Sequence, residues 1–268
     1  MWRRAPTAAR ALGLRAQRRI PWLGGDGYNG TVTVLAHDPV LVWTGAGDGS
    51  LTGAANWGAN ESPDLTDPSL TLDFRRATSA NPIALSGVVA PAAAITSGDI
   101  NQGAPHFTGE GTLVLDGTTV ETNSLVFTGN ASLTYNGTGT LVLKGSVSST
   151  TGTLTVASGK VILDGSAWHG NVVVMSSAEL EVLSSCGPSV FTGESGASRC
   201  TLRLDGRLSL GAGVSAEAKA AWIGGCLAHR DKTYGSSESA AVMRDDVHFA
   251  GSGTLVSRSV PGMMMIVK

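Results

Sequence analysis

A short phrase of alternating apolar and polar residues, followed by a turn, returns through the middle of the chain and constrains its fold more than any other feature. Its strongest copies begin at Thr112, Thr140, Lys160, Glu179 and Thr201, with starts 28, 20, 19 and 22 residues apart. Alternation at a period of two places the apolar residues on one face of a strand, and β-branched residues favour the pleat. Asp-Gly and Asn-Gly pairs tolerate positive φ angles and turn the chain. Each copy is therefore predicted to be a short strand that ends at a corner.

Weaker copies of the phrase lie between the strong ones, and together they suggest coils of about 20 residues with two or three strands each, as in a β-solenoid. The weaker copies begin at Ser124, Ser132, Thr153 and Asn171. The sequence therefore predicts an all-β fold in which residues 101–215 form a parallel β-helix. Asp-Gly turns also join antiparallel hairpins, and the spacing is irregular. An antiparallel β-sandwich stays open as the alternative.

Composition agrees with a folded, β-rich chain. The 268 residues include 36 glycines, 15% are charged and 42% are hydrophobic, which is too apolar for a disordered chain. No apolar run approaches the ~18 residues of a membrane-spanning helix. The three cysteines have no zinc-site spacing, which leaves free thiols or a single Cys186–Cys200 bridge. No phosphate-binding loop, serine nucleophile elbow or zinc-protease motif is present, and no metal or cofactor is predicted.

Two segments carry a resemblance to a known family. Gly137-Thr-Gly-Thr-Leu-Val-Leu-Lys-Gly145 and Gly152-Thr-Leu-Thr-Val-Ala-Ser-Gly-Lys-Val-Ile-Leu163 resemble the autotransporter-associated β-strand repeat. Upstream, Val42-Trp-Thr-Gly-Ala-Gly-Asp-Gly49 with Ala54-Ala-Asn-Trp57 resembles the leader that often precedes such repeats in bacterial surface proteins. The resemblance covers about half of the chain and is more specific for fold than for activity. It implies the right-handed β-helix of secreted passenger domains, a fold that phage tail fibres and spikes share.

The flanks of the repeat divide the chain further. Residues 26–100 hold strand-like pieces at Thr31–Leu35, Val40–Trp43 and Leu70–Phe74 and are expected to form a small β domain that covers the first rung. Residues 216–268 are expected to form a C-terminal cap. It would be introduced by a helix over Val214–Ile223 and end in a strand over Met263–Val267.

Residues 1–25 form a basic arm that contains six arginines and no acidic residue, which leaves a net charge of −8 on the remainder. Residues 7–19 follow a helical pattern with Thr7 as a possible N-cap. We interpret the arm as an anchor on an acidic partner subunit; a solvated tail and an organellar transit peptide are the alternatives. The acidic remainder disfavours nucleic acid as a partner. The expected anchoring residues are Trp2, Arg3, Arg4, Arg10, Arg15, Arg18, Arg19 and Trp22.

The acidic residues of the repeat are candidate sites. Asp116, Asp164 and Asp205 all precede a turn glycine, and one column of carboxylates along a β-helix would suit a sugar or Ca²⁺. Turn chemistry explains the same placement and is preferred.

The remaining polar groupings are Asp245 and Asp246 with His248, and the pair Trp168 and His169. Adjacent residues on a strand face opposite ways, so Asp245 and Asp246 would share a site only in a loop. Ordinary solvated loop residues are preferred, and no catalytic residue is predicted.

The leading hypothesis is a non-enzymatic β-helical structural protein of a bacteriophage virion, such as a tail fibre, spike or capsid-attached protein. It would be assembled in the host cytoplasm, because arginines interrupt every candidate secretion signal and no room remains for a membrane barrel. Expected partners are other virion subunits, further copies of the chain (a trimer by analogy) and a host-surface glycan. A bacterial surface or secreted adhesin module is the alternative. A polysaccharide-cleaving β-helix enzyme is the third.

Overall fold

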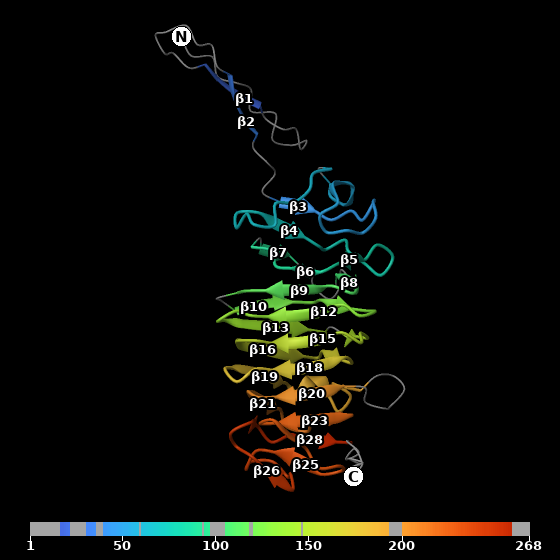
Figure 1. The fold of residues 1–268 in the computed structure, drawn as a ribbon, viewed down its shortest axis with the longest axis vertical. Coiled ribbons are helices and arrows are strands. Elements are labelled where there is room, and N and C mark those ends of the chain that lie inside the picture. The colour runs from blue at the N-terminus through green and yellow to red at the C-terminus, as the bar shows by residue number, and fades with distance from the viewer. Residues whose placement is uncertain are drawn as a thin grey trace, which may run out of the picture.

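The computed structural model describes residues 17–21, 31–35, 40–58, 60–92, 94–96, 105–117, 120–145, 147–192 and 200–258. Most of these residues form an elongated stack of short strands that runs from β3 (Val40–Val42) to β26 (Met243–Arg244) (Figure 1). Across the described ranges, the helical elements are two 3-10 turns, η2 (Ala54–Asn56) and η3 (Ser184–Cys186). No helix in this part of the chain has the length and apolar character to cross a membrane.

Within the described residues the largest sheet has eight strands, and it faces the viewer in Figure 1. Its strands pair in parallel from β6 to β23, and only β24 joins antiparallel. The strands, in spatial order, are β6 (Val88–Val89), β9 (Thr112–Leu115), β12 (Ser132–Tyr135), β15 (Thr153–Val156), β18 (Asn171–Val174), β20 (Thr201–Leu204), β23 (Ala220–Ile223) and β24 (Cys226–Leu227).

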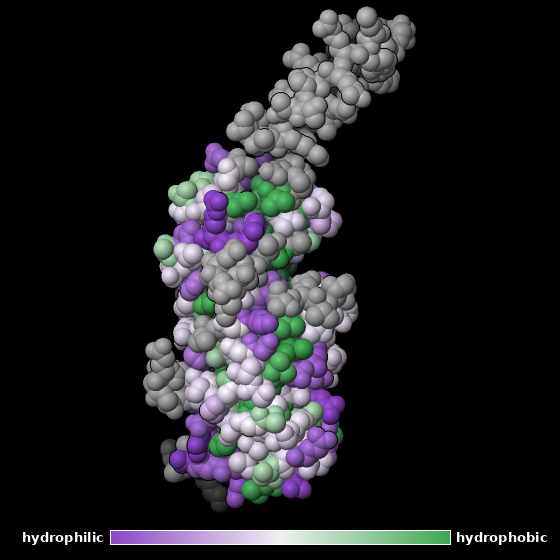
Figure 2. Space-filling view, turned by 180° about the vertical axis from the view of Figure 1, so that it is seen from behind, coloured by the Kyte–Doolittle hydropathy of each residue, from purple (hydrophilic) through white to green (hydrophobic). Residues whose placement is uncertain are grey.

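A second sheet, of six described strands, lies behind the first and is parallel throughout. Figure 2 shows the molecule from this side, where the outer surface mixes hydrophilic and hydrophobic side chains. The strands, in spatial order, are β10 (Val120–Asn123), β13 (Thr140–Lys144), β16 (Gly159–Asp164), β19 (Ala178–Val182), β21 (Arg207–Leu210) and β27 (Phe249–Ala250).

Shorter sheets complete the described structure. Three of them continue the parallel pairing along the stack: β3 with β4 (Thr71–Asp73) and β7 (Ala94–Thr96); β5 (Ile83–Leu85) with β8 (His106–Gly109) and β11 (Val126–Phe127); and β14 (Val147–Ser148) with β17 (Ala167–Trp168). At the C-terminal end, β22 (Ser215–Ala218) pairs with β28 (Thr254–Ser257), and β25 (Thr233–Gly235) and β26 follow. β1 (Gln17–Pro21) and β2 (Thr31–Leu35) pair antiparallel with each other.

The chain visits these sheets in a fixed order. β9, β10 and β11 lie in the eight-stranded, six-stranded and three-stranded sheets. One level further along the stack, β12 and β13 return to the two large sheets, and β14 lies in the two-stranded sheet with β17. Thr112 is paired with Ser132, and Thr140 with Lys160, so one circuit takes roughly 20 residues. All described strand pairs between residues 105 and 215 are parallel, which excludes antiparallel hairpins for the repeat. The prediction of an all-β fold with parallel pairing is confirmed.

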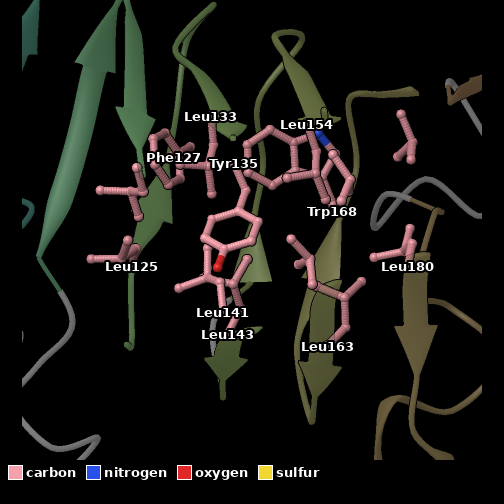
Figure 3. Close-up of a cluster of buried hydrophobic side chains, with 14 of the residues drawn as sticks. Leu125, Phe127, Leu133, Tyr135, Leu141, Leu143, Leu154, Leu163, Trp168 and Leu180 are labelled. Atoms are coloured by element: carbon pink, nitrogen blue, oxygen red, sulfur yellow. The ribbon is translucent and has the colours of Figure 1, made fainter. Parts of the chain in front are cut away.

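The core lies between the two large sheets, because each strand points alternate side chains inward. Leu133 and Tyr135 of β12 are buried, and so are Leu154 and Val156 of β15 (Figure 3). Leu141 of β13 faces them from the opposite sheet. Full burial of one such aliphatic side chain contributes about 1.5–3 kcal/mol, so the repeat supplies its stability one level at a time.

A column of aromatic rings runs inside the stack, and all of its rings are buried. Phe107 stacks on Phe127 with centroids 5.1 Å apart, and Phe127 meets Trp168 at 5.3 Å. Upstream, Phe74 contacts Phe107 at 5.7 Å and Trp57 at 5.7 Å. Such contacts add about 0.5–1.5 kcal/mol each beyond burial. The column joins residues 40–96 to the repeat in one continuous core.

The segment that resembles a leader forms a closed loop at the start of this column. Trp43 and Trp57 form an antiparallel bridge and pack edge to face at 5.3 Å. Between them, the Asn56 side chain is fully buried and accepts the backbone N–H groups of Gly47 and Gly49 at 2.8 and 3.2 Å. Its amide donates to Asp48 at 2.9 Å. Asp48 and the glycines therefore serve this loop, because a buried amide needs its hydrogen bonds satisfied.

Of two helices expected from the sequence, one is wrong and the other is contradicted at its C-terminal end. In the predicted helix over residues 7–19, Gln17–Arg19 lie in strand β1, where Ile20 precedes Pro21 and so disfavours helical backbone; residues 7–16 lie outside the described residues. Val214–Ile223 forms strands β22 and β23. There Ala216, Ala218 and Ala221 are the buried positions, so small side chains concealed a period of two. The predicted strand over residues 263–267 lies outside the described residues.

Candidate binding surface

The outer face of the eight-stranded sheet is built by register. Thr112 pairs with Ser132 and Thr153 pairs with Asn171. The register of the adjacent pairs places Thr153 next to Ser132 and Thr201 next to Asn171, so these side chains form one outward column. The partner pairs Leu133–Leu154 and Val172–Leu202 fix this register, and they point inward. The face is consequently rich in hydroxyl and amide groups over much of its length.

Trp222 interrupts this polar face near its C-terminal end. It is the Cα partner of Arg203 on one side and of Leu227 on the other. The sharp turn into β24 is made by Gly224 and Gly225, whose φ angles of 55° and 79° suit a two-residue hairpin of the type that matches strand twist. Trp222 is 37% exposed and Leu227 is 42% exposed, so the hairpin presents an indole at the surface where most large aromatics of the chain are buried.

A hollow of about 560 Å³ lies beside this indole. Asn171 is oriented within it, because its Oδ1 accepts the Thr201 backbone N–H at 3.2 Å. The Arg203 side chain is 64% exposed, and its Nε lies 3.6 Å from Oδ2 of Asp205. The lining residues are Thr153, Asn171, Val173, Thr201, Arg203, Trp222 and Gly225.

A second hollow, of about 340 Å³, lies on the six-stranded sheet. Lys160 lines this hollow and forms ion pairs with both Glu179 and Glu181, with Nζ to oxygen distances of 3.1 and 2.7 Å. Partial burial lowers the pKa of Lys160, but the hydrogen bonds that its ammonium donates to Glu181 and Glu179 outweigh this effect and raise the pKa. Because Lys160 is already paired with two glutamates, it is less available to an anionic ligand than the exposed Arg203 beside Trp222.

The three aspartates of the repeat phrase do not form one column. Asp116 and Asp205 follow strands of the eight-stranded sheet, with the levels of β12, β15 and β18 between them, whereas Asp164 ends β16 of the six-stranded sheet. The strong copies of the phrase therefore lie on two faces, and the idea of a shared carboxylate row is wrong. Asp164 accepts the Ser185 hydroxyl at 2.7 Å, which fixes a corner.

Asp245 and Asp246 do lie in a turn, but they serve different partners. Asp245 accepts the backbone N–H groups of Val247 and His248 at 2.9 and 3.2 Å, and its other oxygen lies 2.7 Å from His248 Nδ1. Asp246 accepts the Ser237 backbone N–H at 2.7 Å. Burial raises the pKa of Asp245, but the hydrogen bond to His248 and the two backbone bonds outweigh it, so the pKa is lowered. These contacts hold the turn before β27.

The other sequence candidates are placed as follows. Trp168 is a buried core residue whose Nε1 has no partner within the described structure, and His169 follows it at the surface side of β17. Arg18 and Arg19 of the arm lie in β1, paired with Val34 and Thr33. The other expected anchoring residues, Trp2, Arg3, Arg4, Arg10, Arg15 and Trp22, lie outside the described residues. Across the described residues, no cluster of three His, Cys, Asp or Glu side chains is arranged to hold a metal ion.

Sequence reasoning missed Trp222 because the residue fell inside the segment that was predicted to be a helix. The available signal was the Gly224-Gly225 pair, since two glycines between short apolar runs predict a hairpin. Comparison with known proteins adds no relative: no family model, no curated protein and no solved structure matches this chain.

Proposed function

We propose that the parallel sheets form a right-handed β-solenoid and that the protein is a non-enzymatic structural component of a bacteriophage virion, of the tail-fibre or spike type. In this role the stack of coils is a stiff rod, and its outer face displays a glycan-binding surface. The handedness follows from the strong preference of parallel strand crossovers for right-handed connections.

The observation that carries the proposal is the register of the stack. Inward positions such as Leu133, Leu154 and Val172 align from level to level, and the outward hydroxyl column aligns with them. Each level forms its strand pairs only with the adjacent levels, so the chain gains length without a larger core. Both hollows are open depressions on outer faces, which suits display of a surface to a partner.

Shape and location test this proposal together. Electron microscopy and small-angle scattering of the purified chain should show an elongated particle, and antibodies against it should label virion fibres or spikes. A compact particle would contradict the rod. Particles that lack the chain altogether would contradict the virion role.

A bacterial surface adhesin is the second candidate, because β13 and β16 lie in the two segments that resemble autotransporter passenger repeats. The same labelling separates the two candidates. Antibody on the outer envelope of a bacterium, with none on virions, would favour the adhesin.

A further inference from the structure

Among the described residues that line it, the hollow beside Trp222 has one cation and no carboxylate. The guanidinium of Arg203 is 64% exposed, and its contact with Asp205 is a single long approach of 3.6 Å. Exposed pairs of this kind contribute little and are readily exchanged. A planar guanidinium binds a carboxylate through two parallel hydrogen bonds, so Arg203 suits a carboxylate from a ligand.

Trp222 supplies a different kind of contact next to this cation. Because Trp222 and Arg203 are Cα partners on neighbouring strands, their side chains leave the same face of the sheet side by side. The π face of an indole carries negative potential and attracts polarised C–H groups as well as apolar surface. The C–H face of a pyranose ring offers both. An aromatic platform beside a cation therefore matches a sugar ring that bears a carboxylate.

Asn171 and the hydroxyls complete the match. The Asn171 Oδ1 is held by the Thr201 N–H, which leaves its Nδ2 group with two donors and no partner among the described residues. Thr153 and Thr201 line the same hollow. Amide and hydroxyl groups that are fixed by a rigid sheet pair well with sugar hydroxyls, which both donate and accept.

We infer that this hollow binds a uronate residue of an acidic polysaccharide, with Arg203 on the carboxylate, Trp222 under the ring and Asn171 on a ring hydroxyl. The inference rests on the proposed display function and names its ligand class. A protein partner is disfavoured, because a stable protein interface buries about 1,000 Å² or more with an apolar centre. Of the seven described residues that line this hollow, four carry hydroxyl, amide or guanidinium groups, and the exposed apolar side chains beside them are Trp222 and Leu227.

Binding of short oligosaccharides to the full chain tests the inference. Trigalacturonate, trimannuronate and a hyaluronan tetrasaccharide are titrated by calorimetry and ligand-observed NMR, with fully methyl-esterified trigalacturonate as the uncharged match. We expect at least one uronate to bind. Esterification of a binding galacturonate and the variant Arg203→Gln should each weaken binding roughly ten-fold, about 1.4 kcal/mol.

Variants assign the contacts. Trp222→Ala should reduce uronate binding at least as much as Arg203→Gln, and Trp222→Phe should restore part of it. The matched control is Arg76→Gln, because Arg76 is an exposed arginine between β4 and β5 and lines neither of the two hollows. It should leave binding unchanged.

Three outcomes would overturn the inference. They are no binding by any uronate, equal binding of the ester and the acid, or a loss of self-association in Trp222→Ala, which would make the face a contact between copies. None of these outcomes contradicts the rod or its location, because each copy of Trp222→Ala should still be elongated even where copies no longer associate. A failure of the inference is thereby separated from a failure of the proposed function.

Discussion

Phe127 and Trp168 pack with ring centroids 5.3 Å apart, although a further level of the stack lies between them. The residue at that level is Ser148, which is the Cα partner of Trp168 and accepts the Phe127 backbone N–H on its hydroxyl at 3.2 Å. A side chain this small leaves room for the two rings to meet across it. The contact between the two rings therefore depends on a small residue at position 148.

Ser148→Val should destabilise the protein, because the added methyl groups push the two rings apart and the Phe127 N–H loses its acceptor. Overpacking and an unsatisfied buried donor each cost about 1–3 kcal/mol. Urea denaturation measures the change. Ser209→Val is the control, because Ser209 points outward from β21, and its free energy of unfolding should change by about 0.5 kcal/mol or less. Equal losses of unfolding free energy in Ser148→Val and Ser209→Val would contradict the packing of Phe127 and Trp168 across Ser148.

Much of this core was predictable from the sequence. The phrases at Leu133-Thr-Tyr135 and Leu154-Thr-Val156 predict which residues point inward, and all four apolar residues are buried. The aromatic column was not predictable, because its members within the repeat come from β8, β11 and β17 and meet only through the register of separate levels. Alternation specifies a face of one strand. The level at which that strand stacks depends on tertiary pairing.

Gly137→Ala should destabilise the protein strongly. A Cβ at this position would clash with the carbonyl oxygen of Gly117 on the neighbouring level and with the Tyr135 ring, so successive levels would have to separate. The matched variant is Gly165→Ala, where φ is +59° and no atom lies within 4 Å of the added Cβ. Only the left-handed backbone is strained there, at about 1–2 kcal/mol. The melting temperature of Gly137→Ala should be lower than that of Gly165→Ala. The reverse order would contradict the close approach of Gly137 to the Gly117 carbonyl.

The candidate surface was less predictable than the core. Asp116 and Asp164 occupy the same place in their phrases, yet the structure puts them on different sheets. Residues 214–223 have the composition of a helix because alanines fill the inward positions of two strands. Trp222 therefore could not be assigned to a sheet face. Its neighbours in the hollow come from strands as distant in sequence as β15.

The three thiols should react at very different rates, because the structure holds them free and at different depths. Cys226 is exposed in the β23–β24 hairpin, whereas burial raises the pKa of Cys200 to about 12 and suppresses its thiolate. Burial also raises the pKa of Cys186. A disulfide reagent at pH 8 should modify Cys226 first and Cys200 only after unfolding. Loss of the fast phase in Cys226→Ser checks the assignment, and a Cys186–Cys200 disulfide found by mass spectrometry would contradict it.

Acid should weaken the N-terminal part of the stack through Asp73. Its carboxylate is almost fully buried, and the hydrogen bonds from Arg75, with Nε to Oδ1 at 2.9 Å, hold its pKa below the ordinary value of about 3.9. The unfolded chain therefore takes up the proton first, so this stabilisation is complete above pH 5 and is lost as the pH falls through 4 toward the folded pKa.

Asp73→Asn should be less stable than the parent at pH 7, by about 1.5–3 kcal/mol for lost bonds to a charged group. This difference in unfolding free energy between the parent and Asp73→Asn should shrink as the pH falls. Asp48 and Asp245 titrate in both proteins and cancel from the comparison. Arg75→Gln removes the donor that lowers the Asp73 pKa, so its own difference in unfolding free energy from the parent should also shrink as the pH falls. Urea titrations from pH 7 to 3 measure both differences. A difference for Asp73→Asn that stays constant with pH would rule out this role for Asp73.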